Sequence, residues 1–207
     1  MDIRQLSETV TGLIRRKQFG QAEAMLSAAR QETTESGDFD ALDFVLSEFA
    51  ALCGQMEPPD IARVEAFCLE REAVRNTGYN KWQTAMTFYW VVRDSRRTVI
   101  KSREAVQKAT EEKDSKTLYS ALSLLGLALL ELDRIEEAGA TLNEIGNMAR
   151  RKMRIVVGDE TLFLERANER GLDRPTIKDI ANILAPVCRD QSFAERLRAL
   201  AVQELPR

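Results

Sequence analysis

Residues 120–151 read SALSLLGLALLELDRIEEAGATLNEIGNMARR, and this stretch decides the fold. Apolar residues recur three and four positions apart up to Leu129, the pattern stops at Asp133, and it resumes from Ala138 to Ile145. Such spacing places apolar side chains on one face of a helix. The stretch therefore predicts two helices joined by a tight turn near Asp133.

The same stretch resembles a tetratricopeptide repeat, a helical hairpin of about 34 residues with apolar and small residues at fixed positions of both helices. The matching positions are Leu122, Leu125, Gly126, Leu129, Ala138 and Leu142. Ile145 stands where that family usually has a small residue, and Arg150 stands where a proline often closes the repeat. The resemblance implies an all-α solenoid of helical hairpins. It also implies that Gly126 lies where the two helices of the hairpin approach most closely.

Three weaker hairpins are predicted earlier in the chain, over residues 2–36, 38–78 and 79–113. Gly37 is expected to end the first hairpin, Pro58-Pro59 to open the second helix of the next, and Asp94 to cap a helix in the third. Equivalent positions recur about 40 residues apart, as in the pairs Ala22 and Ala62, and Ala29 and Leu69. This step resembles the longer, divergent members of the tetratricopeptide family. An unrelated helical bundle remains the alternative fold.

The repeat pattern is lost after Arg154. A short β-branched run, Ile155-Val156-Val157, precedes three further predicted helices that end near Glu204. A solenoid needs a terminal element with a polar outer face, because its last repeat otherwise exposes an apolar side. We therefore expect two parts: residues 1–154 form about four tetratricopeptide-like hairpins, and residues 155–207 form a C-terminal helical cap.

Composition narrows the classes of function. The charges of the 30 basic and 33 acidic residues nearly cancel, which gives a net charge of −3. The protein as a whole therefore has no strong positive potential that would attract nucleic acid or an anionic membrane. No apolar stretch approaches the roughly 20 residues of a membrane span, and the N-terminus has no signal-peptide core. The chain is therefore expected to be soluble and cytoplasmic, without membrane association.

Motifs that carry catalytic chemistry are sparse. The chain has no histidine, which excludes the usual Ser-His and Cys-His nucleophiles, and its three cysteines form no Cys-x-x-Cys pair for a zinc site. Phosphate-binding glycine loops are also absent from the sequence. The acidic pairs Glu136-Glu137 and Asp159-Glu160 lie where helices are predicted to begin, and acidic residues there complement the helix dipole. We therefore expect no enzymatic activity, metal or cofactor, and an enzyme with carboxylate chemistry ranks third among the possibilities.

The resemblance also supplies a candidate binding site. In the tetratricopeptide family the first helix of each repeat lines a concave groove. This implies a row of residues that faces a partner: Arg4, Ser7, Phe44, Ser47, Thr84, Thr87, Ser120 and Ser123. Small hydroxyl side chains would admit an extended peptide or a helix, and they would equally let neighbouring helices pack closely. We expect a non-enzymatic scaffold or adaptor that binds a protein or peptide, and the sequence leaves homo-oligomerisation open.

The alternative function uses the basic stretch from Arg93 to Arg103, which follows Tyr89 and Trp90. Aromatic rings beside basic side chains are typical of proteins that bind single-stranded nucleic acid. Core aromatics next to a solvated basic face would have the same composition. A regulatory or nucleic-acid-associated module is therefore the second interpretation.

Overall fold

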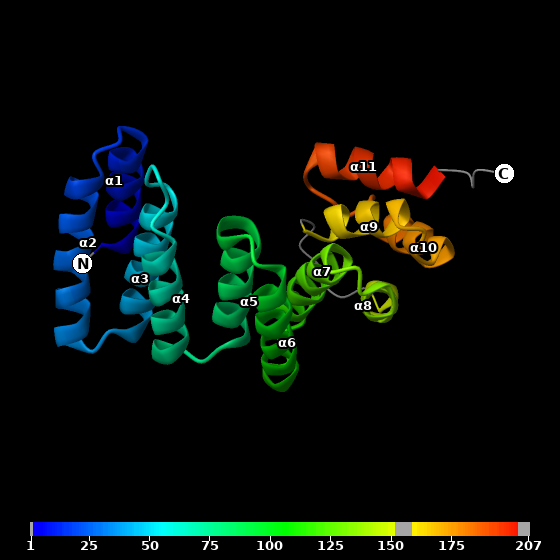
Figure 1. The fold of residues 1–207 in the computed structure, drawn as a ribbon, viewed down its shortest axis with the longest axis horizontal. Coiled ribbons are helices and arrows are strands. Elements are labelled where there is room, and N and C mark those ends of the chain that lie inside the picture. Colours follow the sequence, from blue (N-terminus) through cyan, green and yellow to red (C-terminus); the bar gives the residue numbers. More distant parts are fainter. Residues whose placement is uncertain (1, 152–158, 203–207) are drawn as a thin grey trace. The chain divides into compact units, whose positions relative to one another are not determined.

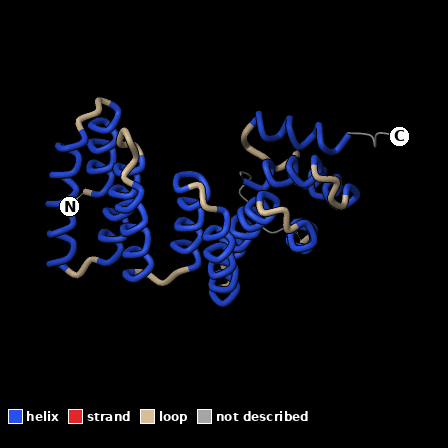
Figure 2. The backbone as a smooth tube through the Cα atoms, viewed as in Figure 1, coloured by secondary structure: helices blue, strands red, loops and turns tan. Residues whose placement is uncertain are grey.

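The computed structural model describes residues 2–151 and 159–202 (Figure 1). Within these ranges the chain forms eleven α-helices and one short π-helix, and no strand occurs in them (Figure 2). This confirms the all-α class. The run at 155–157 and the expected boundary after residue 154 lie outside the described residues. No helix in the described ranges combines the length and the apolar character that crossing a membrane requires.

The chain divides into two compact units, Met1–Arg93 and Asp94–Arg207. The helices of the first unit are α1 (Ile3–Arg15), α2 (Phe19–Ser36), α3 (Phe39–Gly54), α4 (Ile61–Val74), α5 (Gly78–Thr87) and the π-helix η1 (Phe88–Val92). Those of the second unit are α6 (Ser95–Glu112), α7 (Ser115–Glu131), α8 (Ile135–Arg150), α9 (Asp159–Glu169), α10 (Arg174–Leu184) and α11 (Gln191–Val202).

Local chemistry sets several helix ends. Gly37 follows α2 in the left-handed conformation, at φ 69°, which costs glycine nothing because it has no Cβ. The Asp94 carboxylate accepts a hydrogen bond from the backbone N–H of Arg97, at 3.0 Å, and so caps α6. Both caps confirm the sequence prediction. The prediction for Pro58-Pro59 was wrong, because α4 begins at Ile61 with Asp60 as its N-cap and both prolines precede it.

The core of the first unit surrounds α3, which packs against α1, α2 and α4. Its buried side includes Leu46, Phe49 and Leu52, and the Phe49 ring stacks on Phe67 of α4 with centroids 4.6 Å apart. Three exposed or half-exposed ion pairs join residues 40 positions apart: Lys17 with Glu57, Glu23 with Arg63, and Arg30 with Glu70. These pairs link α2, or the turn before it, to α4, or the loop before it.

The buried positions of α4 follow a different step. The predicted equivalents of Ala22 and Ala29 were Ala62 and Leu69, but both are exposed, Leu69 at 46%. The buried residues Val64, Cys68 and Arg71 instead lie 42 positions after Ala22, Leu26 and Ala29. Three or four residues complete a helical turn, so a shift of two positions turns the apolar face elsewhere.

Helix α7 lies at the centre of the second unit, in contact with α6, α8 and α9. Its residues from Ala121 to Leu130 are all buried. The predicted turn to α8 is present, with Asp133 in the left-handed conformation at φ 58°. Gly126 is a packing glycine as expected, but its neighbour is not α8. The atoms nearest to its missing side chain belong to the ring of Phe163, on α9.

Candidate functional site

Four of the eight candidate residues lie on α1 and α3 of the first unit and keep some exposure. Arg4 is exposed, and Ser7, Phe44 and Ser47 are half-buried. The Ser7 hydroxyl donates a hydrogen bond to Oε1 of Glu48, at 3.1 Å, and so links α1 to α3. We call the face formed by Arg4, Ser7, Phe44, Ser47 and Glu48 the α1–α3 surface.

The α1–α3 surface exists because three neighbouring helices cover only part of α3. The side chains of α3 that remain accessible lie three or four positions apart and therefore form one stripe along the helix. They are Asp40, Phe44, Ser47, Glu48 and Ala51. These residues are exposed or half-buried, whereas those on the opposite side, such as Leu46 and Cys53, are fully buried. The stripe combines an aromatic ring, a small hydroxyl and carboxylates along one helix.

Glu48 is electrostatically the most unusual member of this surface. Burial raises the pKa of its carboxyl, and the hydrogen bond from Ser7 opposes that shift. No cation among the described residues forms an ion pair with it. A partly desolvated carboxylate without a counter-ion is less stable in its charged form than one in water.

The two candidates on α5 lie against α4. Thr84 is 2% exposed, and its hydroxyl bonds to the backbone oxygen of Asn80 at 3.1 Å and approaches that of Cys68 at 3.5 Å. Thr87 bonds to the backbone oxygen of Gln83 at 3.0 Å. Burial raises the pKa of the Cys68 thiol, and a hydrogen bond with Thr87 opposes this. The hydroxyls of Thr84 and Thr87 thus serve contacts within the unit.

The last two candidates belong to α7 of the second unit. Ser120 is half-buried, whereas Ser123 is fully buried and donates a hydrogen bond to the backbone oxygen of Tyr119, at 3.0 Å. A hydroxyl that bonds to the carbonyl four residues earlier is already satisfied within its own helix. Ser123, like Thr84, offers almost no surface to a binding partner.

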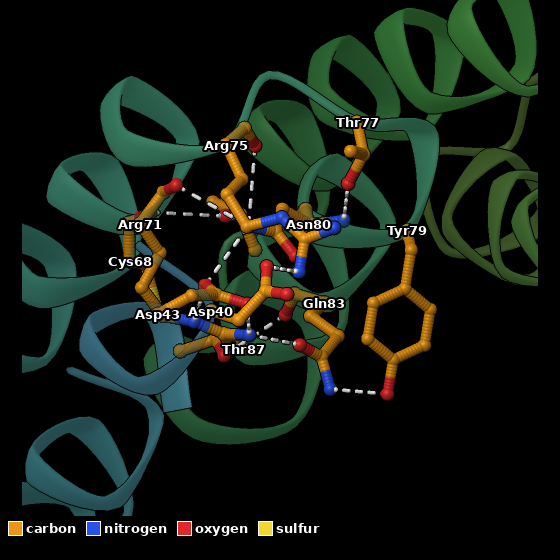
Figure 3. Close-up of polar contacts among 11 residues, drawn as sticks. Asp40, Asp43, Cys68, Arg71, Arg75, Thr77, Tyr79, Asn80, Gln83 and Thr87 are labelled. Atoms are coloured by element: carbon orange, nitrogen blue, oxygen red, sulfur yellow. Dashed lines mark hydrogen bonds and ion pairs between the residues drawn. The ribbon is translucent and has the colours of Figure 1, made fainter. Parts of the chain in front are cut away.

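The structure also contains a buried polar cluster that the sequence did not reveal (Figure 3). Asp43 of α3, Arg71 of α4 and Asn80 of α5 converge there, and each is at most 8% exposed. The Asp43 Oδ1 atom lies 2.9 Å from Arg71 Nε and 2.9 Å from Asn80 Nδ2. Asn80 Nδ2 also reaches the backbone oxygens of Arg71 and Arg75, both at 3.2 Å. One amide thus joins three elements of the unit.

Hydrogen bonds extend this cluster to the surface. Arg71 Nη2 donates to Gln83 Oε1 at 2.5 Å, and Gln83 Nε2 donates to the hydroxyl of the exposed Tyr79 at 2.9 Å. Beside the cluster, Arg75 pairs with Asp40 at 2.7 Å (Figure 3). A buried ion pair is weak evidence for net stability, because desolvating two charges is costly. The cluster joins α5 to α3 and α4 by hydrogen bonds.

The basic stretch is divided between the units. Arg93 ends the first unit, with its guanidinium 5.8 Å from the centre of the Trp90 ring. On α6 of the second unit, Lys101 pairs with Glu104 at 3.0 Å, and Arg103 pairs with Glu137. Arg96 is exposed. Carboxylates thus balance two of the basic charges on α6.

Of the acidic pairs, Glu137 forms an ion pair and Glu160 is buried. Glu137 pairs with Arg134, at 2.6 Å, and hydrogen bonds from Arg134 hold the pKa of its carboxyl below the ordinary value. Glu160 is 1% exposed, and its carboxylate lies near the buried Tyr119. Among the described residues, no group of three or more cysteine, aspartate or glutamate side chains is placed to hold a metal ion. Comparison with models of known protein families gives no match, and no curated protein sequence matches the chain.

Proposed function

We propose that the protein is a non-enzymatic scaffold that binds a helix or an extended peptide of a protein partner on the α1–α3 surface. The observation that carries this proposal is the open stripe on α3. A helix at the centre of a packed unit, in contact with three others, still leaves Phe44 and Ser47 accessible. Partly exposed aromatic rings beside small residues suit recognition of a helix or peptide laid along a rigid face.

The rigidity of the surface supports the proposal. The Ser7–Glu48 hydrogen bond joins α1 to α3, the two helices that form the surface. The stacked rings of Phe49 and Phe67 join α3 to α4. A preformed face avoids the entropy cost of ordering side chains during binding. Arg4 and Ser7 would contact the partner from one helix, and Phe44 and Ser47 from the other.

We further propose that α9 and α10 cover the apolar faces of α7 and α8. In support, Phe163 of α9 fills the space beside Gly126, and Thr176 and Ile180 of α10 lie next to Gly146 of α8. This is the role of a terminal element in a helical repeat protein. If α9 and α10 have this covering role, the first unit is the part that binds the partner.

A nucleic-acid-associated role is the alternative, and the exposed Arg96 and the Trp90–Arg93 contact are the features that favour it. The pairing of Lys101 and Arg103 with carboxylates disfavours it, because a paired cation has less charge to offer a phosphate. Retention on a single-stranded polynucleotide that falls with salt would support this alternative.

Affinity capture from native lysate with two matched variants tests the proposed function. Ser47→Trp places a large side chain on the α1–α3 surface, and Ala28→Trp places the same side chain on an exposed position of α2. The proposal predicts that Ser47→Trp loses a partner that the wild type and Ala28→Trp both retain. A partner that all three proteins retain equally would contradict the proposal, provided that their denaturation midpoints agree.

A further inference from the structure

We propose that the partner segment presents a lysine or arginine side chain, which forms an ion pair with Glu48. This inference rests on the proposed function, because it assigns a chemistry to whatever the α1–α3 surface binds. It follows from how Glu48 differs from several other half-buried glutamates among the described residues.

Several other half-buried glutamates among the described residues form an ion pair. Glu23 lies 2.6 Å from Arg63, Glu70 lies 2.5 Å from Arg30, and Glu165 lies 2.6 Å from Arg196. Glu48 is similarly half-buried, yet within the described ranges its polar contact is the hydroxyl of Ser7. A hydroxyl orients a carboxylate without neutralising its charge.

Other charged side chains near Glu48 already form ion pairs within the protein. Arg4 of α1 pairs with Glu8 at 3.1 Å, and Asp40 of α3 pairs with Arg75 at 2.7 Å. The raised pKa of the Glu48 carboxyl has burial as its main cause, and no nearby cation lowers it. An incoming cation would therefore recover electrostatic energy that the free protein does not obtain.

The surroundings of Glu48 define the side chain that fits. Ser7 donates to Oε1, and no described residue donates a hydrogen bond to Oε2. Phe44 lies one helical turn before Glu48 on the same stripe of α3. The aliphatic part of a lysine or arginine would lie along the Phe44 ring while its charged group reaches the carboxylate. A phosphate backbone does not fit, because the same carboxylate would repel it.

Selection from a library of random linear peptides against the full-length protein tests this inference. We expect that peptides whose binding Ser47→Trp blocks will contain a lysine or arginine. Glu48→Gln should weaken their binding about tenfold, whereas Glu144→Gln, which removes an exposed carboxylate on α8, should not change it. Replacing the basic residue of the peptide by alanine should remove the difference between wild type and Glu48→Gln.

The outcomes separate this inference from the proposed function. Peptides that Ser47→Trp blocks but that bind Glu48→Gln as tightly as wild type would overturn the inference and leave the proposed function intact. Recovery of no peptide that Ser47→Trp blocks would contradict the proposed function itself. The fold of Glu48→Gln is checked by its denaturation midpoint, which should not fall, since the substitution removes a desolvated charge.

Discussion

Phe163 of α9 occupies the space that a side chain on Gly126 of α7 would need. A Cβ atom placed on Gly126 would lie 2.4 Å from Cζ of the Phe163 ring, far inside van der Waals contact. Phe163 is fully buried, so its ring has little room to move aside. The glycine thus allows a helix from the C-terminal part of the chain to pack closely on the central helix of the second unit.

Gly126→Ala should destabilise the protein by about 1–3 kcal/mol, because it forces the Phe163 ring out of its packed position. Gly139→Ala is the matched control, since nothing lies within 4 Å of the Cβ position at that helical glycine. There the better helix propensity of alanine should give a gain of up to about 1 kcal/mol. Urea denaturation measures both changes. Equal midpoints for the two variants would show that Phe163 does not pack on Gly126.

Asn80→Ala should cost about 2 kcal/mol, because it removes a donor shared by the Asp43 carboxylate and two backbone oxygens, all within 3.2 Å. The exposed Asn143 on α8 supplies the control, and Asn143→Ala should change stability by less than about 0.5 kcal/mol. Hydrogen exchange should show the largest loss of protection in α5. A uniform loss throughout the first unit would contradict a local role in holding α5.

Tyr119→Phe should raise stability by about 1 kcal/mol. The Tyr119 hydroxyl is buried, and no hydrogen-bond partner for it occurs among the described residues. Burying a polar group without a hydrogen bond costs free energy, and the substitution removes that cost. A loss of more than about 1 kcal/mol in thermal denaturation would reveal a hydrogen bond that this explanation omits.

Tyr119 also predicts how stability depends on alkaline pH. Burial, and then the Glu160 carboxylate, raise the pKa of its hydroxyl. The folded state therefore holds this proton more tightly than the unfolded state, and stability falls as pH rises above about 10, the ordinary pKa of tyrosine. Titration of the phenolate absorbance should show that one of the three tyrosines ionises only on unfolding. Tyr119→Phe should abolish that late step.

A chain that ends at Arg151 should self-associate. It would lack α9 and α10, which pack against α7 and α8, and so would expose an apolar patch. Light scattering across a range of concentrations measures this against the full-length protein. A shortened chain that stays monomeric with an unchanged melting temperature would show that residues 159–202 do not cover the preceding helices.

Much of the fold was predictable because its signals are local. The glycine after α2 and the aspartate before α6 act within a few residues, and the apolar spacing of α7 and α8 is long and regular. The burial of Val64 and the exposure of Ala62 were not predictable in this way, because neighbouring helices decide which face of α4 turns inward. The π-helix at residues 88–92 was not predicted from the sequence either.

The site was less predictable, because its members are far apart in sequence. Asp43 and Asn80 are separated by 37 positions, and nothing local links them. One signal was present: Arg71 continues the apolar spacing of Val64 and Cys68, and a charged residue on a buried face indicates a buried ion pair. Glu48 gave no such signal. Whether its carboxylate has an ion-pair partner depends on which side chains the neighbouring helices place beside it, and the local sequence does not show this.

Site-specific photo-crosslinking in cells tests the central claim most directly. A photoreactive amino acid placed at position 47 samples the α1–α3 surface, and the same residue at position 28 samples an exposed part of α2. The proposed function predicts that irradiation links position 47, and not position 28, to one discrete polypeptide, and that adding Glu48→Gln weakens this product. A product formed equally from both positions, or nucleic acid linked in place of protein, would contradict it.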